Sequence, residues 1–454
     1  MIKKYISPFI KSYILAWLIA FLLVISSVFL SSISFTEAFK NFVELLSYSQ
    51  FIIGVHILSV VLFILFLIIL YFKGVFKTKG VKTMGKQIFV KVMLPILLIL
   101  LIYNATVYVN TNENYKFKWD YTVENKSGNS KDLYVKDGKH RGMSVFGWGR
   151  NSNKGIDTLV KNNVEWVAVV PFTYQKNETT IAMTTPDVIG QWSRRDSIFI
   201  NSIKTIHSKK MHVMLKPHLW MSEGWRSNIT LNSDSEWDTW FASYRSNMLH
   251  YAQMGEKYNV ELLCIGTELK TSLKKQPKKW LQLIKEIKTI YHGKLTYASN
   301  WDGEYKNVEF WNQMDYIGIQ AYFPLTENEN PNLETIISGW NKHIKTLESL
   351  SITYDKPILF TEVGYRSDAS STIKPWEWSE FTSVLTKKKS DETQLLAFEA
   401  MFKTLWDKEW FKGAYIWEWD NRTQPDSKYM SLNFSPRYKP AQNVIAKWYG
   451  KSIK

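Results

Sequence analysis

Residues 357–365 read Pro-Ile-Leu-Phe-Thr-Glu-Val-Gly-Tyr, an apolar run that carries one carboxylate near its end. A run of this length, opened by proline and followed by Val-Gly-Tyr, is typical of a strand that is buried on both faces. Glu362 stands at the C-terminal end of this predicted strand. Parallel barrels keep their reactive residues at that end of the strands, so Glu362 is the first candidate for a functional group.

Residues 261–269 have the same form and read Glu-Leu-Leu-Cys-Ile-Gly-Thr-Glu-Leu. Here too an apolar strand ends in Thr-Glu, at Glu268. A lone glutamate at a strand end is more often a salt-bridge residue, but two matching endings favour a paired-carboxylate site. Cys264, the only cysteine, lies within this strand. It indicates a small core residue and excludes a disulfide within the chain.

Strands and amphipathic helices alternate over the last 310 or so residues, which predicts a (β/α)8 barrel at residues 140–454. The predicted strands are Gly142–Trp148, Val164–Tyr174, His212–Trp220, Glu261–Leu269, Lys294–Trp301, Tyr316–Phe323, Pro357–Tyr365 and Gly413–Trp419. The predicted helices include Ser235–Tyr258, Pro277–His292, Leu333–Leu350, Glu392–Phe411 and Pro440–Tyr449. An open doubly wound sheet is the alternative, but residues 147–150, Gly-Trp-Gly-Arg, do not supply the G-x-G-x-x-G loop such a sheet would normally carry.

The C-terminal strand ends of a barrel meet at one mouth, so the side chains expected there can be named. They are Trp148, Tyr174, His218, Trp220, Glu268, Asn300, Trp301, Tyr322, Glu362, Tyr365, Trp417 and Glu418. Two glutamates ringed by aromatic and amide groups suit glycoside cleavage, in which one carboxyl is protonated and the other ionised. We therefore expect Glu268 and Glu362 to be catalytic.

The remaining polar and aromatic side chains of this mouth are the candidates for substrate binding. They are Trp148, His218, Trp220, Asn300, Trp301, Tyr322, Trp417 and Glu418. Tyr322 is placed to donate a hydrogen bond to Glu362, although a core tyrosine is the alternative. Trp417 is either a sugar platform or a core residue. No cluster of His, Cys and Asp offers a ligand set, so the sequence predicts no metal and no cofactor.

Three apolar segments without charged residues precede the barrel, at residues 12–33, 51–72 and 92–109. Each has about the length that a helix needs to cross a bilayer, although the third contains Pro95 and is the shortest. A cleaved signal peptide is the alternative for the first segment, but its apolar run is too long for one and two more segments follow. No Asp, Glu, Lys or Arg interrupts them, which favours an anchor over a transporter or channel.

Lysines predict the orientation of these segments. Residues 73–91 carry six lysines, whereas the connection after the first segment has only Lys40 with two glutamates. The positive-inside bias therefore places the N-terminus and residues 73–91 in the cytoplasm, and the barrel outside the cell membrane. We expect residues 1–110 to form a multi-pass anchor and residues 111–139 a polar linker.

The net charge of +16 does not indicate nucleic-acid binding. Residues 1–110 hold ten lysines and two glutamates, a net charge of +8, and those lysines flank the apolar segments. The other +8 is spread over the remaining 344 residues. The chain therefore has no concentrated basic stripe of the kind that nucleic-acid binding uses.

Four stretches resemble the clan of retaining β-glycosidases with (β/α)8 barrels and, within it, glycoside hydrolase family 113, the β-1,4-mannanases. They are Leu-Lys-Pro-His at 215–218, Ile-Gly-Thr-Glu-Leu at 265–269, Phe-Thr-Glu-Val-Gly-Tyr at 360–365 and Phe-Ser-Pro-Arg-Tyr-Lys-Pro-Ala at 434–441. The resemblance covers about residues 138–450. It implies that Glu268 is the general acid/base and Glu362 the nucleophile. Thr267 stands where much of the wider clan has Asn, so Asn300, His218 or Tyr322 would have to contact the sugar 2-hydroxyl.

We therefore expect a membrane-anchored retaining glycoside hydrolase that cleaves β-1,4-mannan or glucomannan by double displacement. The same chemistry on glucan, xylan or a cell-surface polysaccharide stays open, as does a non-catalytic glycan-binding membrane sensor. The expected partners are a polysaccharide or oligosaccharide and the lipid bilayer, with no nucleic acid. The sequence leaves the oligomeric state and endo or exo cleavage undetermined.

Overall fold

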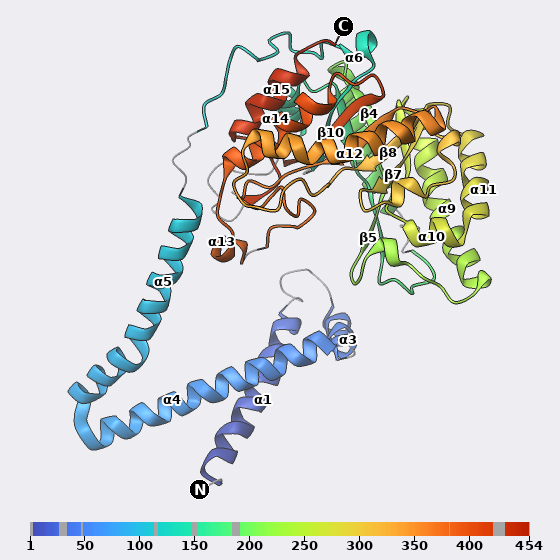
Figure 1. The fold of residues 1–454 in the computed structure, drawn as a ribbon. Helices are drawn as coiled ribbons and strands as arrows, with labels where there is room; N and C mark the ends of the chain where they lie inside the picture. Colours follow the sequence, from blue (N-terminus) through green and yellow to red (C-terminus); the bar gives the residue numbers. More distant parts are fainter. Residues whose placement is uncertain are drawn as a thin grey trace. The chain divides into compact units, whose positions relative to one another are not determined.

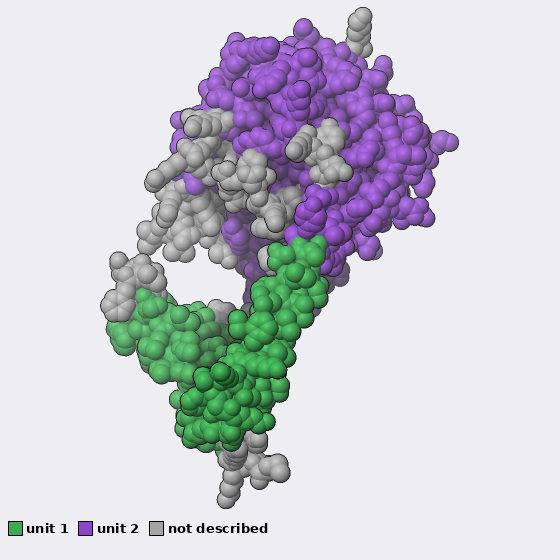
Figure 2. Space-filling model, turned by 90° about the vertical axis from the view of Figure 1, so that its left-hand side faces the viewer, with its two compact units in different colours: residues 1–105 green, residues 106–454 purple. Residues whose placement is uncertain are grey.

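The computed structural model describes residues 3–26, 34–46, 49–112, 117–146, 152–183, 191–380, 382–420 and 432–453. The chain divides into two compact units, residues 1–105 and residues 106–454, which Figure 2 colours separately.

The first unit is built of helices. They are α1 (Lys3–Ile25), α3 (Phe35–Leu45), α4 (Ser49–Ile88), a π-helical turn at Phe89–Met93 and α5 (Leu94–Thr111), whose end belongs to the second unit. Helix α1 packs on α4 through Ala16, Ala20 and Val55.

Two helical stretches of the described chain are long and apolar enough to cross a bilayer, Ile6–Ile25 and Phe51–Thr111. The second includes both the second and the third predicted segments, and its backbone leaves the helical region at Gly80 (φ 76°, ψ 173°). The apolar character of the N-terminal part is thus confirmed, whereas a count of three membrane spans is not.

Eight parallel strands of the second unit form a closed barrel, as the sequence predicts, and the open doubly wound alternative is wrong. The strands of the barrel are β1 (His140–Phe146), β2 (Trp166–Val169), β4 (His212–Leu215), β6 (Leu262–Thr267), β7 (Lys294–Asn300), β8 (Tyr316–Gln320), β9 (Ile358–Val363) and β10 (Phe411–Asp420). They pair in this sequence order, and β10 closes the barrel against β1. Every predicted strand is present.

The second unit also contains helices, the longer labelled ones of which lie around these strands in Figure 1. They are α6 (Tyr134–Asp137), α7 (Ser152–Lys161), α8 (Gln191–Ser208), α9 (Asp234–Lys257), α10 (Lys270–Lys275), α11 (Pro277–Lys288), α12 (Leu333–Tyr354), α13 (Ser383–Thr386), α14 (Asp391–Leu405) and α15 (Pro440–Tyr449), with 3-10 turns at Arg226–Asn228, Glu304–Lys306 and Trp311–Gln313. Ser233, Asn332 and Ser390 cap α9, α12 and α14 by accepting a backbone N–H, and Pro277 and Pro440 open α11 and α15.

Two of the predicted strands are each broken by a proline near the mouth. Pro171 follows β2 and Pro217 follows β4, and beyond them β3 (Phe172–Gln175) pairs in parallel with β5 (His218–Met221). Proline has no N–H to donate, so the barrel ladder cannot pass through it. The result is a separate two-stranded ribbon on the C-terminal side of the barrel.

The opposite, N-terminal side of the barrel is covered by the segment just before β1. The backbone N–H groups of Leu133 and Tyr134 donate to the Glu165 carboxylate at 2.7 and 2.9 Å, and Asp132 contacts His212 at 2.9 Å. Inside the barrel, Trp166 lies stacked between His140 and His212. Residues 130–139, which were expected to belong to a polar linker, therefore pack on the barrel.

Gly413 allows β10 to approach β1 closely. Its φ is 105°, and a Cβ atom here would lie 2.2 Å from the carbonyl oxygen of His140. Gly128 shares a positive φ, at 75°, but has open space around it. We expect Gly128→Ala to cost about 1–2 kcal/mol of unfolding free energy, from backbone strain alone. Gly413→Ala should cost about 1–3 kcal/mol more, because the clash is added.

The measurement is thermal unfolding of the full chain followed by tryptophan fluorescence. Trp17 is the only tryptophan among residues 1–105, so the signal reports mainly on the barrel. Equal midpoints for the two variants would show that the close approach of β10 and β1 is not a constraint.

Candidate active site

The two glutamates lie where the sequence predicts them, at the C-terminal ends of the fourth and seventh barrel strands. Glu268 directly follows β6, and Glu362 lies in β9. Both are buried, with 3% of each residue exposed. Glu268 has a φ of 52°, in the left-handed region that non-glycine residues rarely adopt.

Glu362 is surrounded by groups that stabilise its ionised form. The Lys216 ammonium donates to Oε1 at 2.5 Å, and the Tyr322 hydroxyl donates to Oε2 at 3.0 Å. His218 Nε2 lies 3.4 Å from Oε1. Burial by itself raises the pKa of Glu362, but Lys216 and His218 overcome it and lower this pKa to about 2. Burial also lowers the pKa of His218 to about 4, so its imidazole is neutral at neutral pH.

Glu268 has the opposite electrostatic environment. Burial raises its pKa, the negative charge of Glu362 raises it further, and the Arg226 guanidinium opposes both. Arg226 Nη2 donates to Oε2 at 2.6 Å, and Asn300 Nδ2 donates to Oε1 at 2.9 Å. The two carboxyl groups thus have pKa shifts of opposite sign.

Gln320, at the end of β8, connects the two carboxyl groups. Its side chain acts to lower the pKa of Glu268, against the larger effect of burial, and its Oε1 accepts from Lys216 Nζ at 2.8 Å. Lys216 in turn donates to Glu362. One chain of polar contacts therefore runs from Glu268 to Glu362, and we expect the charge of each group to affect the other.

The predicted binding residues fall into several groups. Asn300, His218 and Tyr322 contact the two glutamates directly. Trp417 is buried; its ring is parallel to that of His218 at 6.3 Å, and it packs in one cluster with Tyr322. Glu418 is half-buried, and after burial and the nearer charge of Glu362 its own charge adds to the raised pKa of Tyr322.

The remaining predicted aromatic residues lie farther from the carboxyl groups or outside the described chain. Trp301 stacks on Trp376 with ring centroids 4.7 Å apart. Trp220, on the β3–β5 ribbon, is 50% exposed. Trp148 lies outside the described residues. Tyr365, expected at the mouth, is instead fully buried and packs on Phe398 of α14.

Several residues of this site were missed in the sequence. They are Lys216, Arg226, Gln320, Trp376 and Trp378. Lys216 lies in the Leu-Lys-Pro-His stretch, and Gln320 ends a predicted strand, so both positions carried a signal that was not used. Trp376 and Trp378 come from the long loop after β9, where no periodic pattern marks them; Trp378 packs edge-on against Trp417.

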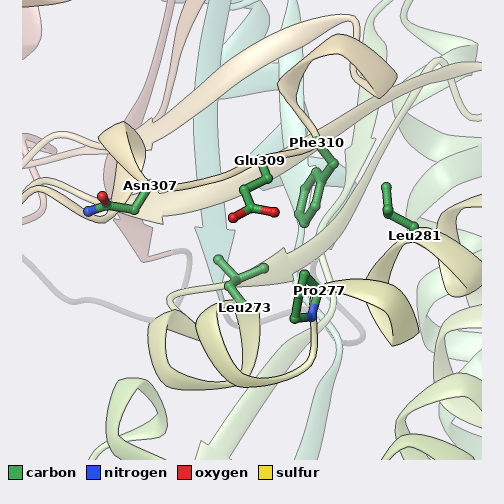
Figure 3. A pocket seen from close by; sticks show the side chains of 6 residues that line it. All are labelled: Leu273, Pro277, Leu281, Asn307, Glu309 and Phe310. Carbon is green, nitrogen blue, oxygen red and sulfur yellow. The ribbon is translucent and has the colours of Figure 1, made fainter.

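Other features of the described residues do not compete with this site. No group of three His, Cys, Asp or Glu side chains there is arranged to hold a metal ion. A small surface pocket between α10, α11 and residues 307–310 is lined by Leu273, Pro277, Leu281, Asn307, Glu309 and Phe310 (Figure 3). It includes neither of the two buried glutamates, Glu268 and Glu362.

The opposite pKa shifts of these two glutamates define what the candidate active site can do. It can supply one ionised carboxylate, Glu362, and one carboxyl group, Glu268, that retains its proton to higher pH.

Comparison with known proteins gives a consistent result. The sequence model of glycoside hydrolase family 113 matches residues 147–434. The structure of a β-mannanase of that family from Alicyclobacillus acidocaldarius, in complex with ManMIm, is 25% identical with a TM-score of 0.60, covering 68% of this chain and 97% of that one. A β-1,4-mannanase complex of the same family is 23% identical with a TM-score of 0.58, covering 68% and 98%, and supports the fold. No curated protein matches this chain.

The Lys216–Glu362 pair can be tested by stability. Lys216→Met leaves a buried carboxylate without its cation, which should cost about 3–5 kcal/mol of unfolding free energy at pH 7. Glu362 of the wild type stays ionised down to a pKa of about 2. In the variant, burial should raise the pKa of Glu362 above that of the unfolded chain. As pH falls from 7 to 5, Glu362 of the folded variant then takes up a proton, and the loss of unfolding free energy relative to the wild type becomes smaller.

Lys139→Met is the matched control for this prediction. Lys139 is also buried, but among the described residues its ammonium donates to the carbonyl oxygens of Lys408 and Phe411 and to no carboxylate. Its pKa is about 8, so it is charged at both pH values, and its loss of about 1–3 kcal/mol should not change with pH. The measurement is urea unfolding followed by tryptophan fluorescence. The same deficit at pH 5 and pH 7 in both variants would contradict the assigned pairing.

Proposed function

The chain belongs to glycoside hydrolase family 113, and on this premise we propose that it hydrolyses β-1,4-linked mannan or glucomannan with retention of anomeric configuration. It is a glycoside hydrolase, so its substrate is a carbohydrate. The choice of mannan is favoured by the β-mannanase of the same family that this chain resembles over 97% of that enzyme's length.

The observation that carries the mechanism is the opposite pKa shift of the two buried carboxyl groups. We assign the ionised Glu362 as the nucleophile and Glu268 as the general acid. As a Glu362 oxygen forms a bond to the anomeric carbon, the glycosidic C–O bond breaks. Glu268 transfers its proton to the departing oxygen.

The second half of the reaction reverses these roles. Formation of the glycosyl ester removes the negative charge of Glu362, so the pKa of Glu268 falls and its carboxylate acts as the base. It takes a proton from water as the water oxygen bonds to the anomeric carbon, and the bond to Glu362 breaks. Arg226, which contacts Glu268 at 2.6 Å, stabilises the ionised carboxylate of this step.

The other groups of the mouth are proposed to bind the sugar chain. His218, Asn300 and Tyr322 each contact one of the two carboxyl groups, which suits hydrogen bonds to the hydroxyls of a sugar held between them. Trp148, Trp220, Trp301 and Trp417 are proposed as stacking surfaces for sugar rings, with Glu418 as a hydrogen-bond partner. The stack of the half-buried Trp301 on the exposed Trp376 is the described aromatic pair that best suits this role.

Activity measurements test the assignment of the glutamates. The full chain in detergent is assayed for reducing-sugar release from mannan, glucomannan, β-glucan and xylan. We expect activity on the mannans, no turnover by Glu362→Ala, and a loss of about 10²–10⁴-fold for Glu268→Ala.

The control is Glu309→Ala, because Glu309 is exposed and lies in the pocket of Figure 3. Wild-type activity in Glu362→Ala would refute the nucleophile. Activity confined to β-glucan or xylan would keep the mechanism and replace the substrate.

We also propose that residues 1–110 anchor the enzyme by three membrane crossings, near residues 12–33, 51–72 and 92–109, with residues 111–139 joining them to the catalytic domain at 140–454. The apolar stretches Ile6–Ile25 and Phe51–Thr111 support the anchor. The second is long enough for two crossings, and the lysines of residues 73–91 fall between them.

Introduced cysteines test this topology, because Cys264 is buried and gives little background labelling. Lys82→Cys and Lys131→Cys both replace exposed lysines of the full chain. A membrane-impermeant maleimide added to intact cells should label position 131. It should label position 82 only after the membrane is permeabilised. Labelling of both positions in intact cells would rule out the proposed orientation.

A further inference from the structure

The backbone at Glu268 is held in an uncommon conformation by several hydrogen bonds. A non-glycine residue with a φ of 52° is strained by about 1–3 kcal/mol and persists only where its surroundings hold it. The N–H of Glu268 donates to the carbonyl of Ala298 at 2.9 Å, and Ser227 Oγ donates to the carbonyl of Glu268 at 2.8 Å. These contacts fix the residue but do not reach its carboxyl group.

Tyr297, on the neighbouring strand β7, holds the next peptide. Its hydroxyl oxygen accepts from the N–H of Leu269 at 2.6 Å and donates to Glu304 Oε1 at 2.6 Å. The absence of a side chain at Gly266 leaves room for this ring, and also for those of Tyr244 and Trp280. A Cβ atom on Gly266 would lie 2.8 Å from Cε2 of Tyr297. The glycine two residues before Glu268 thus has a physical explanation.

Glu304 joins this contact to the carboxyl group of Glu268. Its second oxygen, Oε2, accepts from the backbone N–H of Asn300 at 2.8 Å. The side chain of the same Asn300 donates to Glu268 Oε1 at 2.9 Å. One buried carboxyl group therefore fixes both the peptide that follows Glu268 and the amide that orients its carboxyl oxygen.

Burying the polar groups of Tyr297 and Glu304 costs free energy, which argues against the idea that these side chains only fill space in the core. Glu304 is 1% exposed, and burial raises its pKa to about 8. Tyr297 is fully buried among the aromatic rings of Trp280, Phe310 and Trp311. Apolar side chains would fill such a space without the penalty of burying a carboxyl and a hydroxyl group.

We propose that Tyr297 and Glu304 are positioning residues, which act through Leu269 and Asn300 to hold the Glu268 carboxyl group in its working orientation. This inference rests on the acid/base role proposed for Glu268. Both side chains reach Glu268 only through Leu269 and Asn300, so their loss should impair proton transfer more than substrate binding.

Glu268 is needed in two steps, protonation of the leaving group and deprotonation of the attacking water. The test uses a substrate and a nucleophile that each make one of these steps independent of Glu268. The full chain in detergent is assayed on mannohexaose, whose leaving group needs a proton, and on 2,4-dinitrophenyl β-mannobioside, whose leaving group does not. Azide is then added to the second assay. Azide attacks the anomeric carbon of the glycosyl-enzyme without a base and releases Glu362, so it replaces the water step and yields a β-glycosyl azide.

We expect Tyr297→Phe to lower kcat on mannohexaose by about 10- to 100-fold with a smaller change in KM, because a small displacement of a catalytic group is enough for such a loss. Azide should raise kcat of this variant on the dinitrophenyl substrate and leave the wild type unchanged. Glu304→Gln keeps the volume of the side chain but replaces one of the two carboxyl oxygens that accept hydrogen bonds with an NH2 group, and it should respond in the same direction.

Tyr244→Phe is the matched control. The Tyr244 hydroxyl is also buried and donates to the carbonyl of Ile265 on the same strand at 2.8 Å. Among the described residues no hydrogen bond leads from it to Asn300, so Tyr244→Phe should lose stability but show no azide response. If Tyr297→Phe and Glu304→Gln resemble this control while Glu268→Ala responds to azide, the positioning role is refuted. If Glu268→Ala itself does not respond, the acid/base assignment fails, and the positioning role fails with it.

Discussion

The buried contact between the Lys216 ammonium and the Glu362 carboxylate, 2.5 Å apart, links the architecture of the barrel to its chemistry. Lys216 follows β4, its partners Glu362 and the Thr361 carbonyl lie on β9, and Gln320 ends β8. One side chain thus joins three strands at the mouth. Burying two charges is costly, and the complete set of hydrogen bonds around the ammonium offsets that cost. The same contact keeps one carboxyl group ionised while burial favours the proton on the other.

The barrel and its paired glutamates could be predicted because their signals are local. Apolar runs that end in Thr-Glu mark β6 and β9 within fewer than ten residues each, and closure of eight parallel strands brings such ends to one mouth. Two strands came out shorter than predicted, because Pro171 and Pro217 interrupt the ladder within apolar runs that otherwise look continuous. Tyr365 was predicted to lie at the mouth but packs on α14. The apolar residues beside it in the sequence are compatible with either position, so the pattern could not distinguish them.

The polar partners of the glutamates could not be predicted in the same way. Lys216 and Glu362 are separated by 146 positions in the chain, and Lys216 and Gln320 by 104. No periodic pattern encodes which side chains meet across a barrel, because that depends on strand register and on the inward or outward direction of each residue. Trp376 and Trp378 belong to a loop, where neither helical nor strand periodicity applies. For the N-terminal helices the local signal is clear, because their length and apolar character can be read from the sequence. The number of membrane crossings could not be predicted from it, because that number depends on where the helix beyond Phe51 turns.

Pro171 and Pro217 also separate the barrel strands, whose register is fixed by their neighbours, from the β3–β5 ribbon, whose sequence is less constrained by the barrel. Lys216 directly precedes Pro217, and a residue before proline is confined to extended conformations, so the proline helps to fix the lysine backbone. Beyond the prolines, the β3–β5 ribbon pairs only with itself among the described strands. Substitutions at exposed positions of the ribbon, such as Trp220, therefore leave the barrel register and the Lys216 contact unaltered. His218 at the start of β5 and Arg226 in the turn after it differ, because they contact Glu362 and Glu268. In evolutionary terms, the exposed side chains of the ribbon are where substrate preference can diversify while the reaction itself is preserved.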